Sequence, residues 1–374
     1  MTPIKKGSLQ LWSGSDYLHA AGHRATESVD DSVVLAGALP FTPGAEPILF
    51  EAERFERRTW SADDVPSNRA PIVRPGGRAS VQPLPTRATY GRLVREVTER
   101  LQKARAEDGA LRKVVLARRL DVEVERSIDP ARLAHLLRRD PSVTTFLLET
   151  LGEVGGLQEH WVGASPELLV EKRGASVTSG PLAGSARRSA DPGQDRRAAE
   201  ALQSSQKDLE EHRLVVEYVL DTLAPLCSEL SSPDAPKLTS TATMWHLKTD
   251  VGGCLKDRDL PVLDLARRLH PTPAVCGVPS GLSAQMIDEL EPFDRRVYGG
   301  AVGWSDAQGD GRWVVALRCA RVIDRVASLY AGAGIVIDSK PESECDETSA
   351  KFRALLSAFG IEESSTERSL AGHA

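Results

Sequence analysis

Two stretches that lie far apart in the chain place acidic side chains beside a basic one. The first runs from Lys207 to His212, and the second, residues 341–347, is rich in glutamate and is followed by Lys351. Carboxylates at such short spacing can bind a hard cation such as Mg²⁺, and neighbouring lysines suit an anionic substrate. This combination indicates an enzyme.

A helix from Glu342 to Phe359 is predicted for the second stretch. Glu344, Glu347 and Lys351 then stand at positions i, i+3 and i+7 and share one side of that helix. Charge patterns of this kind usually form a solvated surface stripe. Their position directly after a predicted strand and the turn Gly332-Ala333-Gly334 favours a site instead.

Lys207 and Glu211 allow the same two interpretations. At spacing i, i+4 on a predicted helix, the two side chains taken alone indicate a surface ion pair that contributes little stability. The glycine turn is only a weak indication of a nucleotide site, because it lacks the third glycine of a dinucleotide fingerprint. Single histidines such as His246 and His270 are more often structural than catalytic.

The net charge of the chain argues against nucleic acid as a partner. The 374 residues carry a formal charge of −6 at pH 7, and the pI is near 5.8. Binding to phosphate backbones over a broad surface requires clustered Lys and Arg instead. The composition, with 41% hydrophobic and 27% charged residues, is typical of a globular protein that buries a large core.

Cysteine usage and hydropathy predict a cytoplasmic protein with no membrane contact. The five cysteines are odd in number and show no C-x-x-C spacing, so neither a disulfide framework nor a zinc site is expected. Residues 1–12 lack the apolar core of a signal peptide. No window approaches a run of about 18 apolar residues, the length that spans a membrane.

Strand and helix patterns are mixed along the chain, which predicts an α+β fold. A helix is expected from Tyr90 to Ala104, because apolar residues recur there at helical spacing. A strand is expected at Lys113–Val124, and a three-stranded meander at residues 297–305, 312–321 and 327–333. Further strands are expected at residues 144–149, 161–163, 168–171 and 175–178, and further helices at 130–138, 262–269 and about 196–229, the last with a break.

The two ends of the chain carry weaker signals. Short strands are expected at residues 32–38 and 47–52, between breaks rich in Pro and Gly. The tail, residues 362–374, is polar and is predicted to be disordered.

Ten short segments carry a more specific signal when they are taken together. They are residues 113–118 (KVVLAR), 163–169 (GASPELL), 181–188 (PLAGSARR), 207–212 (KDLEEH), 244–247 (MWHL), 270–277 (HPTPAVCG), 291–295 (EPFDR), 298–304 (YGGAVGW), 317–320 (LRCA) and 331–336 (AGAGIV). In order and spacing they resemble the chorismate-utilising enzymes, and within that group the isochorismate synthases of siderophore and menaquinone biosynthesis. The resemblance covers roughly residues 88–360.

The resemblance implies a reaction and two catalytic residues. Isochorismate synthases add water at ring C2 of chorismate while the C4 hydroxyl departs and the double bonds shift. By resemblance Lys113 is the base for the water, which requires an amine that is at least partly neutral. Glu167 is by resemblance the acid for the leaving oxygen, which requires a carboxyl group with a raised pKa.

The resemblance also implies a cofactor and a set of substrate contacts. Mg²⁺ is expected on the ring carboxylate of chorismate, with Glu211 and Glu344 as ligands and Glu347 holding a metal-bound water. Arg318 and the backbone amides of the glycine turn are expected to bind the enolpyruvyl carboxylate. The expected substrate-binding residues are Gly184, Ser185, His246, Ala274, Arg318, Gly332, Gly334 and Lys351.

Alternatives within and outside the family stay open at this point. Anthranilate synthases usually carry Gln where Lys113 stands, and aminodeoxychorismate synthases carry a nucleophilic Lys where this chain has Ala183, so ammonia is disfavoured as the nucleophile. Salicylate synthases share the lysine base and the metal glutamates but go on to eliminate pyruvate, and they are the second candidate. A Mg²⁺-dependent binding module, a different class of protein, would leave Lys113 and Glu167 without a chemical task.

The resemblance finally implies an architecture. The fold of anthranilate synthase component I is expected, with large and mostly antiparallel sheets flanked by helices and an active site in a central cleft. Residues 89–361 would form the chorismate-binding region, and residues 1–88 a divergent N-terminal part of the same domain. A monomer is expected, with a weak dimer as the alternative.

Overall fold

One antiparallel sheet runs through most of the chain. The computed structural model describes residues 6–24, 33–59, 70–74, 76–106 and 111–361. Within this part, hydrogen bonding links the strands in the order β5 (Ala79–Leu84), β6 (Lys113–Val124), β20 (Val326–Ile335), β19 (Cys319–Ile323), β8 (Leu157–Ser165), β7 (Thr144–Val154), β1 (Lys6–Ser13), β2 (Asp16–Arg24), β4 (Ile48–Thr59), β3 (Leu35–Leu39), β17 (Ala301–Ser305), β18 (Gly311–Val315), β9 (Leu168–Arg173), β10 (Ser176–Gly180), β15 (Val251–Leu255) and β12 (Cys227–Ser231). The short strand β16 (Gly277–Val278) pairs with the first residues of β6.

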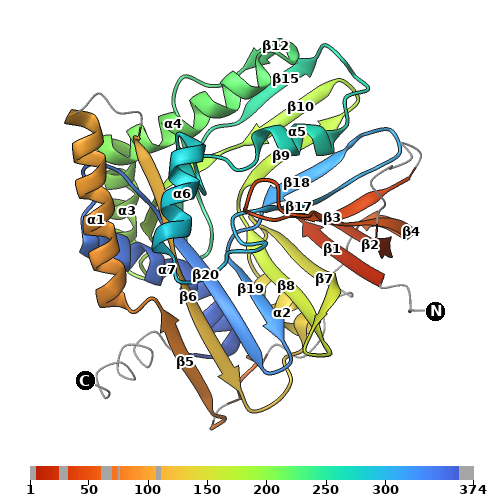
Figure 1. Cartoon of the computed structure of the whole chain (residues 1–374), viewed down its shortest axis with the longest axis horizontal. Helices are drawn as coiled ribbons and strands as arrows, with labels where there is room; N and C mark the ends of the chain where they lie inside the picture. Colours follow the sequence, from red (N-terminus) through yellow and green to blue (C-terminus); the bar gives the residue numbers. More distant parts are fainter. Residues whose placement is uncertain (1–5, 25–32, 60–69, 75, 107–110, 362–374) are drawn as a thin grey trace.

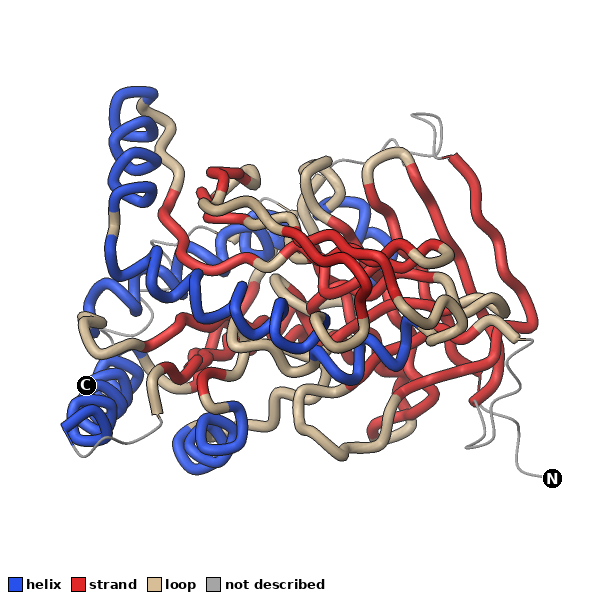
Figure 2. Tube along the Cα trace, turned by 90° about the horizontal axis from the view of Figure 1, so that it is seen from above, coloured by secondary structure: helices blue, strands red, loops and turns tan. Residues whose placement is uncertain are grey.

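A second, smaller sheet and the helices complete the fold. The second sheet holds β11 (Leu182–Arg187), β14 (Met244–Lys248) and β13 (Lys237–Ser240). The helices are α1 (Arg87–Ala106), α2 (Pro130–Leu137), α3 (Pro192–Ser204), α4 (Gln206–Leu223), α5 (Val262–Leu269), α6 (Ser280–Leu290) and α7 (Pro341–Phe359). Figure 1 shows α1, α3, α4 and α7 on one side of the molecule and β1–β4 at the opposite edge. Figure 2 shows the same division from above, with helices mainly at one end and strands at the other.

The core is divided among three clusters of buried apolar side chains. The first lies under α1, α4, α5 and α6, and the second between α2, α7 and the strands β6, β8, β19 and β20. The third contains no helical residue and lies mainly between strands, around Trp161, Tyr298 and Tyr330. The first half of β6 is buried at every residue, whereas its second half alternates between buried and less buried positions. A strand covered on both sides can carry a buried charge only if a partner is supplied from outside the strand.

The strongest helical patterns are confirmed. The helix expected at residues 90–104 lies within α1, and the helix expected from Glu342 to Phe359 is α7, with Pro341 in its first turn and Gly360 closing it in a left-handed conformation. The expected break in the long helical stretch lies at Ser205, whose side chain caps α4. The expected end at residue 229 is wrong, because α4 stops at Leu223 and β12 begins at Cys227.

The predicted three-stranded meander is wrong. The run 312–321 is divided into β18 and β19, which do not pair with each other: β18 pairs with β9 and β17, and β19 pairs with β8 and β20. The chain changes direction at Arg318, which has a φ of 48°. Apolar composition gave no sign of this break, although the break places Arg318 in the pocket described below. Sequence patterns also missed α6.

The N-terminal strands are hydrogen-bonded to strands that come much later in the chain. β1 pairs with β7, and β3 pairs with β17 from Leu35↔Ser305 to Leu39↔Ala301. The strands expected at residues 32–38 and 47–52 correspond to β3 and to the start of β4, and residue 32 lies outside the described residues. The tail expected to be disordered, residues 362–374, also lies outside them.

Truncation of Leu355 on α7 tests this packing. The side chain is fully buried in the second cluster, so Leu355→Ala is expected to lower the free energy of unfolding by about 2–5 kcal/mol. Ser357 lies exposed on the same helix, so Ser357→Ala should change the free energy of unfolding by less than about 0.5 kcal/mol. Urea unfolding followed by circular dichroism measures both variants. Equal stability of the two would contradict this placement of α7.

Candidate active site

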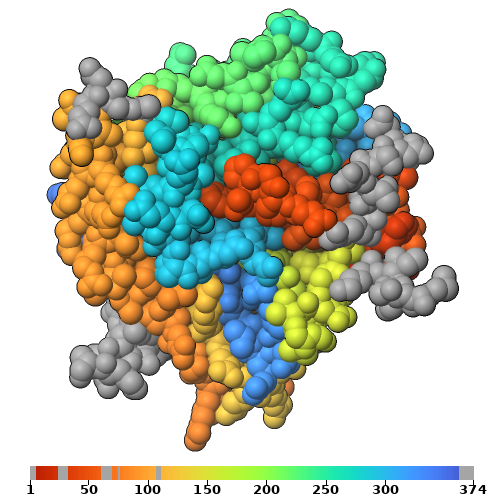
Figure 3. Space-filling model, in the orientation of Figure 1, coloured from red at the N-terminus to blue at the C-terminus, as the bar shows by residue number. Residues whose placement is uncertain are grey.

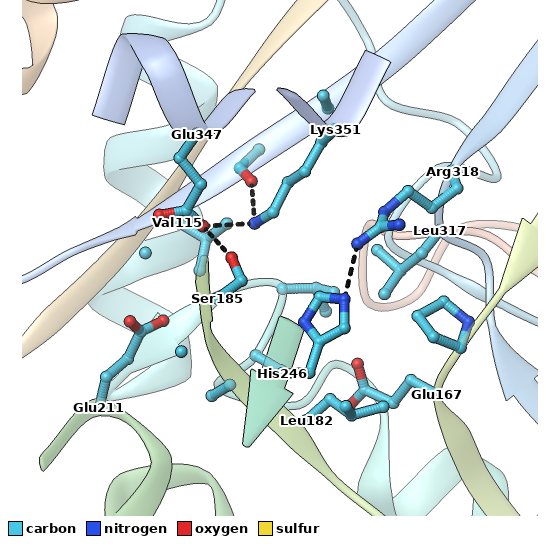
Figure 4. A pocket seen from close by; sticks show the side chains of 18 of the residues that line it. Val115, Glu167, Leu182, Ser185, Glu211, His246, Leu317, Arg318, Glu347 and Lys351 are labelled. Carbon is cyan, nitrogen blue, oxygen red and sulfur yellow. Dashed lines mark hydrogen bonds and ion pairs between the residues drawn. The ribbon is translucent and has the colours of Figure 1, made fainter. Parts of the chain in front are cut away.

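The expected site residues gather around one pocket, which has a cavity volume of about 70 Å³. All of them line it except Lys113 and Glu344, which are buried directly behind its wall. The wall is built from β11, β14, β20, α4, α7, the segment around Ala274 and the turn at Arg318. Figure 4 shows the labelled side chains converging from these elements. Residues that are far apart in the sequence therefore form a single site.

Lys113, the first residue of β6, is fully buried and forms an ion pair with Glu211 of α4. Lys113 Nζ lies 2.9 Å from Glu211 Oε1, and it makes no aligned hydrogen bond with any described residue. Gly334 of β20 covers the pair on the pocket side: a Cβ atom there would lie 2.2 Å from Glu211 Oε1 and 2.8 Å from Lys113 Cε. Only a glycine allows the strand to approach the pair so closely.

Glu347 and Lys351 of α7 form the second charged pair of the site. Lys351 Nζ lies 2.6 Å from Glu347 Oε1 and donates a hydrogen bond of 2.8 Å to the carbonyl oxygen of Gly332. Ser185 Oγ donates to the same carboxylate oxygen at 2.8 Å, as Figure 4 shows. Burial acts to raise the pKa of Glu347, but Lys351 and Lys207 outweigh it and hold this pKa below the ordinary value.

Glu344 is fully buried and pairs with Lys207 of α4, with 2.5 Å between Glu344 Oε1 and Lys207 Nζ. The surface ion pair considered for Lys207 and Glu211 is therefore wrong, because each side chain turns to a different partner in the interior. Burial, with the nearby charge of Glu347, raises the pKa of Glu344 to about 7. Its second oxygen, Oε2, accepts no hydrogen bond from the described part of the chain.

The three glutamates have the donor chemistry that a hard cation requires. They supply only carboxylate oxygens, which suit Mg²⁺, and the buried Oε2 of Glu344 lacks a hydrogen-bond donor. Among the described residues, no three acidic, histidine or cysteine side chains already stand close enough together to hold a metal. Each glutamate is instead neutralised by a lysine. The residues fit a divalent cation in type.

Glu167 lies on the other side of the pocket from Glu211 (Figure 4) and follows the end of β8. Its side chain is buried, and burial raises its pKa to about 8, although the backbone N–H of Leu182 and the charge of Lys113 act in the opposite direction. At neutral pH this carboxyl group therefore holds its proton. A protonated carboxyl at a pocket wall can serve as a general acid.

Arg318 and His246 form a hydrogen-bonded pair in the same wall. Arg318 Nη2 donates to His246 Nε2 at 2.9 Å. Because a guanidinium only donates, Nε2 must be the unprotonated nitrogen, so the imidazole is neutral with its proton on Nδ1. Burial and the charge of Arg318 hold the pKa of His246 well below 6.5. Burial also lowers the pKa of Arg318 to about 10, which leaves it charged at neutral pH.

His212 fixes the wall formed by β11. Its Nδ1 lies 3.2 Å from the carbonyl oxygen of Ala183, to which it donates, and its Nε2 lies 2.8 Å from Thr249 Oγ1. Burial lowers the pKa of His212 to about 4, so it is neutral in this position. The residue next to Glu211 therefore ties α4 to the segment that carries Gly184 and Ser185.

Several lining residues were not predicted. They are Val115, Pro166, Leu182, Ala183, Val275, Tyr298, Leu317, Tyr330 and Ala331. Two of them follow from the period of a strand: Tyr330 shares a face of β20 with Gly332 and Gly334, and Val115 shares a face of β6 with Lys113. No local pattern marks Tyr298, which reaches the pocket from the turn before β17 and stacks on Tyr330 at 5.2 Å between ring centroids.

Comparison with known proteins places the chain in a family. The family model described as chorismate binding enzyme matches residues 51–360. The chain is a chorismate-binding enzyme. The isochorismate synthase DhbC of Bacillus subtilis is 39% identical to it over 97% of this chain and 89% of the relative.

Solved structures confirm the expected architecture of this enzyme. DhbC of Bacillus anthracis superposes with a TM-score of 0.85 at 37% identity, over 95% of this chain and 97% of the other. Anthranilate synthase component I of Streptococcus pneumoniae shares the fold, with a TM-score of 0.68 at 19% identity, over 95% and 93% of the two chains. In the described part of the enzyme, no helix has the length and apolarity needed to cross a membrane.

Substitution of Gly334 tests the close approach of β20 to the charged pair. The new Cβ atom of Gly334→Ala would lie 2.2 Å from Glu211 Oε1, so the carboxylate has to move away from Lys113. Chorismate consumption is expected to fall roughly 10²-fold, the size of effect that a misplacement of about 1 Å produces.

Gly252→Ala is the matched control, because a Cβ atom at this strand glycine meets nothing within 4 Å. Gly252→Ala should unfold at a urea concentration close to that of the unmodified chain, whereas Gly334→Ala should unfold at a lower one, because moving Glu211 away from Lys113 weakens a buried ion pair. Full activity of Gly334→Ala would show that the position of Glu211 is not required.

Proposed function

We propose that this enzyme is a Mg²⁺-dependent isochorismate synthase, an isomerase that converts chorismate to isochorismate. The observation that carries the proposal is the presence of two buried groups at one pocket: an amine, Lys113, behind its wall, and a carboxyl, Glu167, whose pKa is raised to about 8, in its wall. The likeness to DhbC of Bacillus subtilis supports the same reaction.

The reaction exchanges one oxygen of the ring for another. A base removes a proton from the water that attacks C2, the double bonds of the ring shift, and an acid gives a proton to the oxygen that leaves C4. One water molecule therefore enters and one leaves, with no change in oxidation state. Such a displacement needs a neutral base and a protonated acid at the same time.

Lys113 is the proposed base. Its partner in the structure is the carboxylate of Glu211, with 2.9 Å between Lys113 Nζ and Glu211 Oε1. To contact the attacking water, the amine must exchange this partner for the water, which requires that Glu211 be engaged by another charge. The proposed role of Glu211 as a metal ligand meets this requirement.

Glu167 is the proposed acid. Its raised pKa means that most of it is protonated at pH 7, the state from which it can donate to a departing hydroxide. Its position across the pocket from Glu211, the partner of Lys113, suits a reaction in which water enters at one ring carbon and oxygen leaves from another. The two residues thus meet the two demands of the reaction from separate walls.

Glu211, Glu344 and Glu347 are the proposed residues that hold Mg²⁺, the last through a bound water. Mg²⁺ at this position would neutralise the ring carboxylate of chorismate. The three lysines that now neutralise these glutamates, Lys113, Lys207 and Lys351, would then be released toward the substrate or the solvent.

The remaining pocket residues are proposed to bind the substrate. The guanidinium of Arg318 forms no ion pair with any described residue, and its hydrogen bond goes to neutral His246. Its charge is therefore available to the enolpyruvyl carboxylate, together with the amides of Gly332 and Gly334. Lys351 would assist at the carboxylates. The neutral part of the wall, formed by Gly184, Ser185, His246 and Ala274, would contact the ring.

Water is proposed as the nucleophile and isochorismate as the released product. Ala183 lines the pocket without an amine, and Lys113 stands where ammonia-using relatives carry a glutamine, so neither feature supports ammonia. Salicylate synthase is the alternative function, because it requires the same base and the same glutamates.

The state of the protein in solution is also part of the proposal. The pairing of β1 with β7 and of β3 with β17 supports one domain that includes residues 1–88. The free cysteines Cys227, Cys254, Cys276, Cys319 and Cys345 suit a reducing cytoplasm. A monomer that binds no nucleic acid is proposed.

A product assay tests the reaction. Purified enzyme with chorismate and Mg²⁺ is expected to yield isochorismate, resolved by chromatography from salicylate and pyruvate. EDTA should abolish turnover and added Mg²⁺ should restore it. Ammonium salts should yield neither anthranilate nor aminodeoxychorismate, because the pocket offers no group that activates ammonia.

Each arm of the assay has an outcome that overturns one part of the proposal. Pyruvate and salicylate formed as fast as chorismate disappears, near neutral pH, would identify a salicylate synthase. Full turnover in the presence of EDTA would show that the reaction does not require Mg²⁺. No consumption of chorismate at all would favour a binding module.

Substitution of the acid and the base tests their roles. Lys113→Ala and Glu167→Gln should each lower kcat roughly 10²-fold or more while chorismate still binds, because both groups act mainly in the transition state. Lys172→Ala and Glu159→Gln are matched controls, since both residues are buried and neither lines the pocket. Calorimetric titration with chorismate separates lost binding from lost chemistry.

The pH dependence gives an independent check of Glu167. The acid works only while protonated, so kcat of the unmodified enzyme should fall as pH rises through about 8, the raised pKa of Glu167. This decrease should be absent from the residual activity of Glu167→Gln. An unchanged decrease at high pH in that variant would assign it to another group.

A further inference from the structure

Part of β6 has no strand partner on one edge, at the point where it borders the pocket. β16 pairs with Lys113 and Val114, and β5 pairs with β6 from Arg119 onward. Between them, the carbonyl of Val115 and the amide of Ala117 face no strand among the described residues. A buried strand edge of this kind must satisfy its backbone groups by other means.

A buried ion pair satisfies both groups. Arg295 Nη2 donates to the carbonyl oxygen of Val115 at 2.6 Å, and Glu291 Oε1 accepts from the amide of Ala117 at 2.7 Å. The two side chains bind each other through two contacts, Nε to Oε2 at 2.8 Å and Nη2 to Oε1 at 2.5 Å, and each is only 2% exposed. Together they act as a substitute for the missing strand.

α6 contributes a further side chain that holds the backbone of β6, at Lys113, the proposed base. Ser283 Oγ donates to the carbonyl oxygen of Lys113 at 2.9 Å, and Ser283 is fully buried. Residues 113, 115 and 117 of β6 are therefore each held by one side chain from residues 283–295. Figure 3 shows α6, in cyan, covering this part of the molecule between α1 and the N-terminal strands.

Arg295 also contacts two other walls of the pocket. Its Nη1 donates to the carbonyl oxygen of Val275 at 2.7 Å, and its guanidinium carbon lies 5.8 Å from the centre of the Tyr298 ring. Val115, Val275 and Tyr298 all line the pocket, whereas Arg295 and Glu291 do not. One guanidinium thus links three wall segments that come from different parts of the sequence.

Stability alone does not explain such a pair. Two charges buried together often stabilise a fold no better than apolar side chains of similar size, because their desolvation offsets their attraction. What a planar guanidinium adds is a fixed geometry for several acceptors at once. This geometry sets the position of β6 relative to the segments at Val275 and Tyr298.

We infer that Glu291 and Arg295 are positioning residues for the reaction: they hold Lys113 in register with the opposite pocket wall without touching the substrate. The inference rests on the proposed function, in which Lys113 is the base. Loosening of the pair should displace the amine from the attacking water, while Arg318 and Lys351, which the pair does not contact, continue to bind the carboxylates.

Two variants of the full-length enzyme test the inference. In Arg295→Lys, one ammonium cannot reach two carbonyls and a carboxylate. In Glu291→Gln, an amide faces the guanidinium, while the oxygen can still accept from Ala117. Both should lower kcat by about 10- to 100-fold with KM changed by less than about threefold, because a catalytic group is misplaced and substrate binding is kept.

Asp310→Asn is the matched control for Glu291→Gln. Asp310 also pairs with a buried cation, with Lys172 Nζ 2.7 Å from Oδ1, and accepts the backbone amide of Gly174. None of these three residues lines the pocket. The control should lower the urea midpoint to a similar degree but leave kcat and KM unchanged, so a purely structural role is distinguished from a positioning role.

Hydrogen exchange measures the β6 edge independently of turnover. Amide exchange in peptides covering residues 113–118 should be faster in both variants than in the unmodified enzyme, and unchanged in Asp310→Asn. If the unmodified enzyme does not consume chorismate, the proposed function fails, and unchanged exchange in the variants would overturn the inference separately.

Ser283→Ala keeps the test decisive if Arg295→Lys does not fold. It removes one hydrogen bond to Lys113 and should lower kcat several-fold, with faster exchange at residues 113–118. Folded Glu291→Gln and Ser283→Ala variants with kcat within twofold of the unmodified enzyme would overturn the inference. A rise in KM alone would also overturn it, because it would indicate lost substrate binding.

Discussion

Charges buried around the pocket must be neutralised, and most of the site follows from this constraint. A lysine or glutamate removed from water is tolerated only beside an opposite charge or with its proton gained or lost. Lys113 of β6 is neutralised by α4, Glu344 of α7 by α4, and Glu347 within α7. These pairs connect three elements that are distant in the sequence, so the same interactions that lower the cost of burial also bring the site residues together.

Where a residue belongs to a strong local pattern, the sequence was enough to place it. The apolar spacing of α7 predicted a helix with Glu344, Glu347 and Lys351 on one side, and the structure has all three at or behind the pocket. The β-rich run at Lys113–Val124 was predicted as a strand to the residue. The choice between a charged surface and a site could not be made from spacing, because both use the same residues; the resemblance to a family decided it.

The features that could not be predicted all depend on contacts between distant segments. Lys207 and Glu211 have the spacing of a helical ion pair, yet Lys207 pairs with Glu344 and Glu211 pairs with Lys113. An exposed ion pair contributes little free energy, whereas a buried charge without a partner is strongly destabilising. The buried side chains, Lys113 and Glu344, therefore determine the pairing. The break at Arg318 depends on β18 and β19 joining different neighbours, which composition does not encode. Glu291 and Arg295 belong to a segment that was singled out only for the family resemblance, and no local pattern indicated that they complete the edge of β6.

The glycines of β20 show how the same constraint shapes the backbone. Gly332 and Gly334 were expected to form a turn, and this expectation is wrong, because they lie inside a regular antiparallel strand opposite Ala117 and Val115. A side chain at Gly332 would come within 2.8 Å of the Tyr298 hydroxyl, and one at Gly334 within 2.2 Å of Glu211. The absence of side chains at these positions of β20 leaves room for Glu211 of α4 and Lys113 of β6 to form their ion pair behind the strand. Close approach, and not conformational freedom, is the reason for glycine here, since neither residue has a positive φ. The position of β20 at the pocket therefore depends on the absence of side chains at Gly332 and Gly334 as much as on the contacts that its other residues make.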